Sequence, residues 1–285
     1  FAGFEEKVTF ALRDLFSSYG YSRYKMSRFE EYDLYVRNKD FLISDSVITF
    51  TDTNGKLMAL KPDVTLSIIK NGKDGQGSVE KVYYNENVYR VSGGNHGYKE
   101  IMQVGLECIG EIDGYCSYEV LYLTAKSLLA ISSECVLDLS HLGFINAVFE
   151  GVGLDPAYRG RALSLIGEKN LHELKALCKE AELAESDIDT VCSLISLYGS
   201  PDVVMPKLAQ LLDGKETREF RELQGMVNAL RQSDIYDSLR IDFSVVHDKI
   251  NQSMLCKRRN LREAQIIYPG PVLLSGSGPC PDCPG

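Results

Sequence analysis

The chain has 285 residues, 44% of them hydrophobic and 25% charged, so its composition is that of a folded globular protein and argues against a disordered one. Its 31 Lys and Arg against 40 Asp and Glu give a net charge of −9, which does not favour binding to a nucleic-acid backbone, and no apolar run approaches the roughly 20 residues of a membrane-spanning helix. Eight Cys are too dilute for a disulfide-stapled secreted domain and no signal peptide is recognisable, so we expect a cytoplasmic protein with reduced thiols that binds neither nucleic acid nor membrane.

The N-terminal third predicts a helix followed by a β-hairpin. Apolar residues at helical spacing predict a helix over residues 4–19. Residues 46–61 carry β-forming residues on both sides of Asn54-Gly55, and this dipeptide supplies the positive φ angles of a tight hairpin turn. We expect a short helix over 64–70, after Pro62 ends the second strand.

A second pair of strands follows, over residues 80–91 and 99–112. In the second of these strands one face carries only apolar residues and the other carries both polar and apolar residues. This alternation is expected for a strand with two different faces. Residues 117–131 then predict a helix, and residues 136–153 predict a strand and another helix.

The pattern changes to helix alone between residues 154 and 235, and a strand returns at 240–247. Five of the nine prolines lie in the last 17 residues, which cannot continue a regular core. We therefore predict an α+β fold interrupted by a helical insertion. The predicted core has two parts, residues 1–153 and 236–268. The helical insertion between them covers residues 154–235, and an irregular Pro/Gly-rich tail covers residues 269–285.

The strand carrying Gln103 and Glu107 is the most informative for function. Both side chains stand on one face, with Gly105 between them, and alternate residues on a strand face are about 6.5–7 Å apart. A small ligand could lie over the glycine, with the carboxylate attracting an ammonium group. The alternative is a half-buried sheet whose polar face meets solvent and needs no ligand.

Three residues on neighbouring segments have two readings each. Arg90 could bind a carboxylate or phosphate through two parallel hydrogen bonds, or form a salt bridge at the rim. Asp63 could add a second carboxylate, although capping the helix that follows is the better local explanation. Thr65 is equally ambiguous.

Other motifs give no support for a cofactor or a metal. The glycine-rich segment 72–77 matches neither a Walker A loop nor a dinucleotide fingerprint. The Cys280–Cys283 pair has no further zinc ligands nearby in the sequence. We expect no cofactor and no metal.

Taken together, these segments resemble the histidyl-tRNA synthetase family. LMALKPDVT resembles the family's L-x-L-R-P-[ED]-x-T element, and VYRVSGGNHGYKEIMQVGLECIG resembles its motif 2. The resemblance spans roughly residues 4–150 and returns at 240–246. It implies a class II aminoacyl-tRNA synthetase-like fold, an antiparallel sheet flanked by helices, in which the helical insertion matches the family in position only.

The family has two branches, the true synthetases and the non-catalytic ATP phosphoribosyltransferase regulatory subunits, and the sequence favours the second. Asp63 stands where synthetases usually carry Glu, and the family's second motif 2 arginine either appears here as Lys99 or is lost. The segment DFSVVHDKINQ places His247 where synthetases continue into R-G-L-D-Y-Y-T-G. Residues 136–154 resemble the D-x-[SG]-H-x-G segment of the regulatory subunits. Neither G-G-R-Y-D nor a motif 3 G-x-x-R appears in the sequence, and we expect no anticodon-binding domain after the core.

The resemblance implies a histidine-like ligand site with five residues. Asp63, Thr65, Gln103 and Glu107 would surround an ammonium group, Arg90 would lie near the carboxylate, and no residue would be catalytic. The implied function is regulation, with histidine as effector, of the enzyme that opens histidine biosynthesis. The implied partner is the short-form ATP phosphoribosyltransferase catalytic subunit, in a hetero-oligomer built on a homodimer.

Two alternatives stay open: a histidyl-tRNA synthetase core or other histidine-activating enzyme, and an amino-acid-binding sensor module with another partner. The sequence does not decide whether histidine would use this site or a subunit interface. The end of the chain after residue 250 departs from both branches, and we interpret it as a frameshifted or truncated end.

Overall fold

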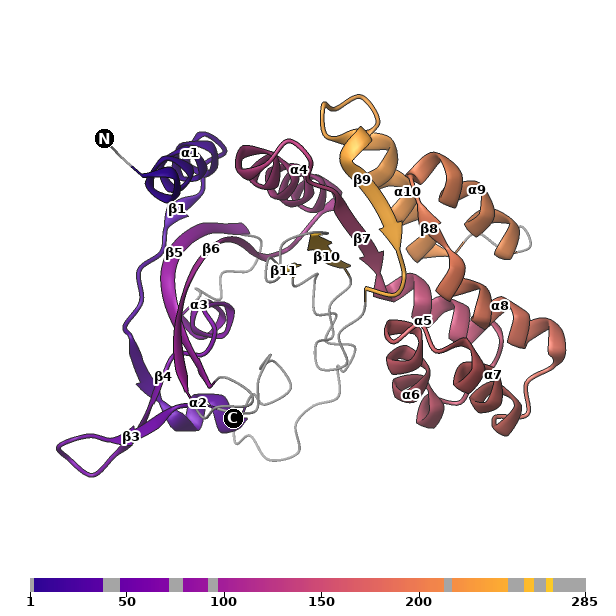
Figure 1. The fold of residues 1–285 in the computed structure, drawn as a ribbon, viewed down its shortest axis with the longest axis horizontal. Helices are drawn as coiled ribbons and strands as arrows, with labels where there is room; N and C mark the ends of the chain where they lie inside the picture. The colour runs from indigo at the N-terminus through magenta and orange to yellow at the C-terminus, as the bar shows by residue number, and fades with distance from the viewer. Residues whose placement is uncertain are drawn as a thin grey trace, which may run out of the picture.

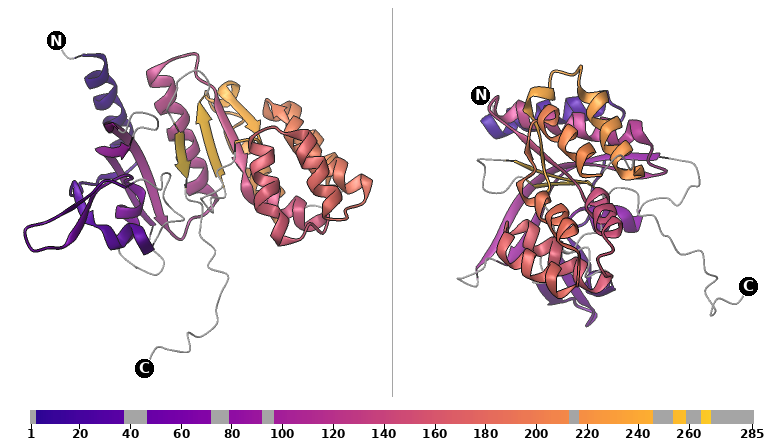
Figure 2. Two further views of the ribbon diagram at one scale, coloured as in Figure 1. Left: turned by 60° about the horizontal axis from the view of Figure 1, so that its bottom comes forward. Right: turned by 90° about the vertical axis from the view of Figure 1, so that its right-hand side faces the viewer.

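A computed structural model describes residues 3–37, 47–71, 79–91, 97–212 and 217–245, together with the backbone of two further strands. The described elements form a sheet-and-helix region and a helical lobe, with β7 and β9 between them (Figure 1). The left view of Figure 2 again shows the lobe set to one side of the sheets. The α+β class predicted from the sequence is confirmed.

The long ribbon that carries the candidate site is formed by two antiparallel strands, β5 (Val79–Val91) and β6 (Tyr98–Gly110). Each is one or two residues from the predicted bounds. A short strand that the sequence did not predict, β1 (Ser22–Arg23), pairs with β5 in parallel, so the sheet is not wholly antiparallel.

One face of this ribbon is covered by α1 (Phe4–Ser18) and α4 (Gly114–Ile131), both predicted from apolar periodicity. Phe16 of α1 contacts Tyr83 of β5, with ring centroids 5.8 Å apart and ring planes tilted by 45°, and both residues are buried. The chain leaves α1 through Gly20, whose φ of +83° is readily available only to glycine.

The opposite face is covered by α3 (Thr65–Asn71), which confirms the short helix expected there. Val64 and Ile68 pack against Val82 and Val88 of β5 in a small buried cluster. This apolar contact fixes the start of α3, and therefore Thr65, over the ribbon.

A small antiparallel sheet precedes α3, formed by β2 (Phe29–Glu31), β4 (Leu57–Leu60) and β3 (Thr49–Thr51), with α2 (Tyr32–Arg37) beside it. The predicted hairpin is therefore present, but its turn differs from the expected one. Within it only Gly55 has positive φ, at +80°, because the Asp52 carboxylate accepts from the N–H groups of Asn54 and Lys56, 2.8 Å each, and builds a longer loop.

A second sheet has the order β11-β10-β7-β9-β8. Its strands are β7 (Leu137–His141), β8 (Tyr198–Gly199), β9 (Leu239–Asp242), β10 (Met254–Arg258) and β11 (Gln265–Tyr268). The strand predicted over 240–247 is too long, because the Asp242 carboxylate accepts from the N–H of Ser244 at 2.9 Å and turns the chain.

The helical lobe fills most of the interval between β7 and β9. Its helices are α5 (Leu142–Gly151), α6 (Pro156–Gly167), α7 (Leu171–Glu180), α8 (Glu185–Ser196), α9 (Pro201–Leu211) and α10 (Arg218–Leu230). The two-residue strand β8 lies inside this interval, so the expectation of helix alone there was incomplete. The domain boundaries themselves stay a prediction, and the tail lies outside the described residues.

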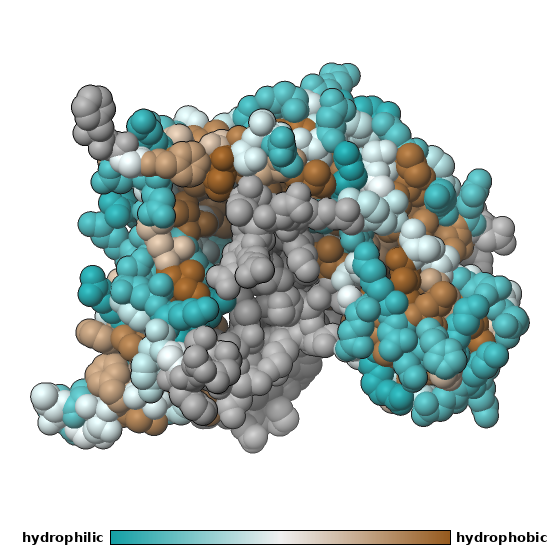
Figure 3. All heavy atoms as spheres, in the orientation of Figure 1, coloured by the Kyte–Doolittle hydropathy of each residue, from teal (hydrophilic) through white to brown (hydrophobic). Residues whose placement is uncertain are grey.

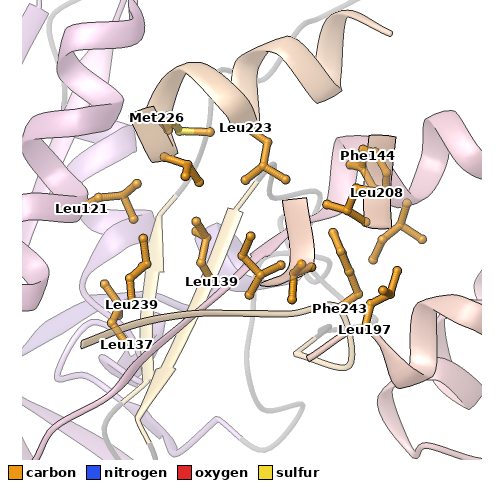
Figure 4. Packing of buried hydrophobic residues seen from close by; sticks show 14 of the residues in the cluster. Leu121, Leu137, Leu139, Phe144, Leu197, Leu208, Leu223, Met226, Leu239 and Phe243 are labelled. Carbon is orange, nitrogen blue, oxygen red and sulfur yellow. The ribbon is translucent and has the colours of Figure 1, made fainter. Parts of the chain in front are cut away.

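Leucines from β7 and β9 join this lobe to the sheet. Leu137, Leu139 and Leu239 face Leu223 and Met226 of α10 in one buried cluster (Figure 4). In the view of Figure 3 the outer surface of the lobe is mainly hydrophilic, as expected for helices that bury one face each. Within the described residues, no helix combines the length and the hydropathy needed to cross a membrane.

Candidate functional site

The polar side chains predicted to bind a ligand lie on one face of the β5–β6 ribbon. Residue pairing sets Val82 opposite Glu107, Tyr84 opposite Gly105 and Glu86 opposite Gln103. Because side chains alternate along a strand, all of these residues share the face that α3 covers. The face assignment predicted for Gln103 and Glu107 is therefore correct.

Glu107 is the most deeply buried acidic group on this face, with 2% of the residue exposed. The Thr65 hydroxyl donates a hydrogen bond of 2.6 Å to Glu107 Oε1. The second oxygen, Oε2, has no hydrogen-bond partner among the described residues. A buried acceptor without a partner costs free energy, which makes this oxygen a candidate point of contact for a ligand.

The surroundings of Glu107 favour its neutral form. The pKa of Glu107 is raised to about 8, chiefly by burial and to a smaller extent by the nearby Asp63 carboxylate, and the Thr65 hydrogen bond opposes this shift without offsetting it. No Lys or Arg described in the structure lies within 4 Å of its oxygens. Among the described residues, the Glu107 carboxyl group therefore has no counter-ion within salt-bridge distance.

Asp63 fulfils the local role expected of it. One of its carboxylate oxygens lies 3.4 Å from the N–H of Leu66, in the first turn of α3, which is a long helix-capping contact. Burial raises the pKa of Asp63, opposed by this contact and by the positive charge of Arg90. Asp63 also acts electrostatically on Glu107, so it both caps the helix and belongs to the cluster.

Tyr84 is a member of the cluster that sequence reasoning missed. A Cβ added at Gly105 would collide with the hydroxyl and ring of Tyr84, which crosses the ribbon at that point. The phenol also interacts with Thr65, and burial together with the Glu107 charge raises the pKa of Tyr84 well above its ordinary value. The expectation that Gly105 leaves open space for a ligand on the strand is therefore wrong, because Tyr84 fills that space.

Arg90 forms no salt bridge within the described residues, so the rim ion pair considered for it is absent there. Its Nε donates to the carbonyl of Pro62 at 3.3 Å, which holds the guanidinium beside the segment leading to α3. Its charge acts on Asp63 and Tyr84. Lys99, its cross-strand neighbour, is exposed.

The remaining predicted residues are less constrained. Gln103 is half-buried on the correct face, and no described residue forms a hydrogen bond with its amide. His247 lies outside the described residues. The structure thus brings together Asp63, Thr65 and Glu107 and places Arg90 beside them.

A buried ion pair beside the cluster was also missed. Lys61 Nζ lies 2.6 Å from Glu86 Oε2, and the Lys61 side chain is 1% exposed. The Lys61 carbonyl accepts from the N–H of Tyr89 at 2.9 Å, so both side chain and backbone fix the 61–65 segment to β5. Periodicity does not distinguish this lysine from an exposed one, although it stands at the arginine position of the L-x-L-R-P-[ED]-x-T element.

His141, at the end of β7, has a structural role. Its Nδ1 accepts a hydrogen bond of 3.0 Å from the N–H of Phe144 and so caps α5. Burial lowers the pKa of His141, although Glu222 and Glu219 oppose the shift, and a neutral imidazole suits an acceptor. The histidine of the D-x-[SG]-H-x-G-like segment is therefore explained by the fold.

A cavity of about 270 Å³ lies elsewhere, between α9 and α10. Its walls combine apolar residues with the Asp202–Arg231 ion pair, whose partners are both about half exposed. It lacks a buried ionisable group without a partner, so the ribbon cluster is the stronger candidate. Within the described part of the chain, no three His, Cys, Asp or Glu residues are grouped to hold a metal ion.

Comparison with known proteins gives one consistent family. The family model described as histidyl-tRNA synthetase matches residues 2–251. A histidine–tRNA ligase of Methanococcus vannielii is 27% identical over 209 residues, covering 71% of this chain and 50% of the relative. An ATP phosphoribosyltransferase regulatory subunit of Ruminiclostridium cellulolyticum is 21% identical over 243 residues, covering 82% of this chain and 57% of the relative. The chain therefore spans about half the length of the curated relatives it matches.

Solved structures show the same fold. A Bacillus halodurans protein described as an ATP phosphoribosyltransferase regulatory subunit/histidyl-tRNA synthetase has a TM-score of 0.76 at 20% identity, covering 90% of this chain and 68% of its own. A chain of an ATP phosphoribosyl transferase (HisG:HisZ) complex from Thermotoga maritima has a TM-score of 0.68 at 19% identity. The match covers 88% of this chain and 86% of the Thermotoga chain. These similarities confirm the class II synthetase-like architecture.

Proposed function

Because the chain belongs to the histidyl-tRNA synthetase family, we propose that it is a non-catalytic relative that binds histidine and regulates an ATP phosphoribosyltransferase. The ligand site would be the cluster of Asp63, Thr65 and Glu107 with Arg90 and Gln103. Glu107 would bind the ammonium group and Arg90 the carboxylate.

One observation carries this proposal: the chain keeps groups suited to an amino acid, but two arginines that its catalytic relatives are expected to use are replaced by other residues. Lys99 stands at the second motif 2 arginine position and His247 at the position of the later arginine. Amino-acid activation develops negative charge on a phosphate, and losing one fixed donor costs about 10²- to 10³-fold in rate. Lysine lacks the planar, two-pronged donor geometry of arginine, so replacing both arginines would favour binding over activation.

The proposed partner is a short-form ATP phosphoribosyltransferase catalytic subunit. Support comes from the regulatory-subunit relative and from the fold shared with a chain of the HisG:HisZ complex. Histidine would act as feedback effector by binding one state of the complex more tightly than another. We further propose a cytoplasmic hetero-oligomer built on a homodimer of this chain.

Histidyl-tRNA synthetase activity is the rival function, and it rests on relatives described as histidine–tRNA ligases at 25–27% identity. An amino-acid sensor with another partner is a third candidate, favoured by the same ligand-binding groups. The synthetase differs from the regulatory subunit in catalysing amino-acid activation. The sensor differs from the regulatory subunit in the protein to which it binds.

Two assays separate these functions. Histidine-dependent exchange of pyrophosphate into ATP is expected to stay at background, and robust exchange would contradict the proposal. Phosphoribosyltransferase activity of the short catalytic subunit is expected to rise on addition of this chain and to become sensitive to histidine. Unchanged activity, with no association in a pull-down, would favour the sensor instead.

A further inference from the structure

We propose that binding of an ammonium ligand at Glu107 releases one proton from the protein to solvent. The inference rests on the proposed function, since it concerns the same ligand and the same site. It adds a coupling between ligand affinity and pH that the family resemblance does not supply.

The geometry around Glu107 is that of a neutral carboxyl group. The residue is 2% exposed, one oxygen accepts from Thr65 at 2.6 Å, and the other has no described partner. An ionised carboxylate buried this deeply needs a cation or several donors, and the described surroundings give it one hydroxyl.

The titratable groups facing Glu107 reinforce this state. Asp63, ahead of α3, brings a second acidic group, and Tyr84 on β5 brings a phenol whose pKa is raised by burial. Arg90 acts on Asp63 and Tyr84, but it is not among the groups that act on Glu107. Lys61, the buried lysine on this side of the ribbon, is already paired with Glu86.

An entering ammonium group changes this balance. It carries the positive charge that the site lacks, so it stabilises the ionised form of Glu107. The O–H bond of the Glu107 carboxyl group then breaks, its electron pair stays on the carboxylate, and the proton passes to buffer. The ligand keeps its three ammonium hydrogens, and an ion pair replaces a neutral acid.

The consequence is that affinity for the ligand rises with pH as long as the empty site is protonated. Since burial raises the pKa of Glu107 to about 8, the coupling covers neutral pH. Linkage then gives an increase in affinity approaching about tenfold for each pH unit below that value.

Calorimetry with L-histidine in two buffers of different ionisation enthalpy, near pH 7, counts the protons. We expect about one proton released per histidine bound by the wild type. Because the histidine imidazole also titrates near this pH, Glu107→Gln provides the baseline and should show no release from the protein. Glu111→Gln, at an exposed acidic residue, is the matched control and should behave as wild type.

A ligand-free measurement keeps the test independent of binding by the variant. Carbon-13 NMR of the glutamate carboxyl groups should show a resonance with a midpoint near 8 that is missing from Glu107→Gln and that shifts to its ionised position when histidine is added. Histidine binding without the extra proton, or a Glu107 already ionised at mildly acidic pH, would overturn the inference alone. Absence of any histidine-dependent heat would contradict the proposed function as well.

Discussion

Two buried glutamates lie on opposite sides of the β5–β6 ribbon. They differ in whether a cation accompanies the buried carboxyl group. Glu119, on α4, is 3% exposed and pairs with Lys81 at 2.7 Å. Burial lowers the pKa of Lys81, but the Glu119 hydrogen bond and charge outweigh this, so the net shift is upward and Lys81 keeps its positive charge. Glu107, on β6, is buried as deeply and has a single hydroxyl donor.

This difference separates a group that holds the fold together from one that is available to a ligand. The rings of Tyr21 and Tyr115 lie 5.6 and 5.8 Å from Lys81 Nζ, which completes the environment of the paired lysine. Nothing equivalent surrounds Glu107 in the described structure. The fold would therefore gain from replacing Glu107 and lose from breaking the Lys81–Glu119 pair.

The largest effect is expected for Lys81→Met. This substitution leaves the Glu119 carboxylate buried without a cation, which should lower the free energy of unfolding by about 3 kcal/mol. Urea denaturation near neutral pH measures it. Lys81→Met/Glu119→Gln is the control, because removing both charges should recover most of the loss. A loss under about 1 kcal/mol would mean that the pair contributes little.

Glu107→Gln should act in the opposite direction. Between the ordinary pKa of 4.5 and the folded value of about 8, the folded protein binds more protons at this site than the unfolded chain. The wild type therefore loses stability from this group as the pH rises through that window. Above pH 8 the variant should be more stable than wild type by about 1–3 kcal/mol, with little difference near pH 5. A destabilised variant at high pH would show that Glu107 has a cation the described structure lacks.

A smaller effect is expected for Thr65→Val, which keeps the shape of the side chain but removes the donor to Glu107. Loss of one hydrogen bond should lower the free energy of unfolding by about 1 kcal/mol. Since this bond lowers the pKa of Glu107, its removal should move the carboxyl midpoint upward. A midpoint that stays in place would remove Thr65 from the cluster.

The smallest effect is expected for Lys56→Met, in an exposed ion pair. Lys56 lies 2.7 Å from Glu31, but both side chains are about half exposed, at 53% and 52%. Solvent screening leaves such a pair little effect on stability, so the urea denaturation midpoint should hardly change. A change comparable with that of Lys81→Met would show that burial is not what distinguishes the ion pairs.

The sequence predicted the β5–β6 ribbon and its two faces because alternation is a local signal, and it predicted α3 from its place after Pro62, which ends the preceding strand. The form of the turn at Gly55 and the early end of β9 were not predicted. In both places an aspartate side chain accepts hydrogen bonds from nearby backbone N–H groups and so sets the backbone geometry. The short strands β1 and β8 were missed because two residues leave no periodicity to detect.

For the site, Gln103 and Glu107 could be assigned to one face from sequence alone. The role of Tyr84 could not, because it depends on the register that sets Tyr84 opposite Gly105. Pairing of Lys61 with Glu86 likewise joins residues 25 positions apart, and only their common burial shows that the lysine is not on the surface. Such information is carried by tertiary contacts and not by local pattern.

The central claim is that the carboxyl group of Glu107 accepts the amino group of a bound amino acid. The most direct test compares the affinity of the wild-type protein for L-histidine with that for 3-(imidazol-4-yl)propionate, which lacks the amino group and is otherwise the same. We expect the analogue to bind at least about tenfold more weakly, because it forms no charged contact with Glu107. Equal affinity for the two compounds would contradict the account.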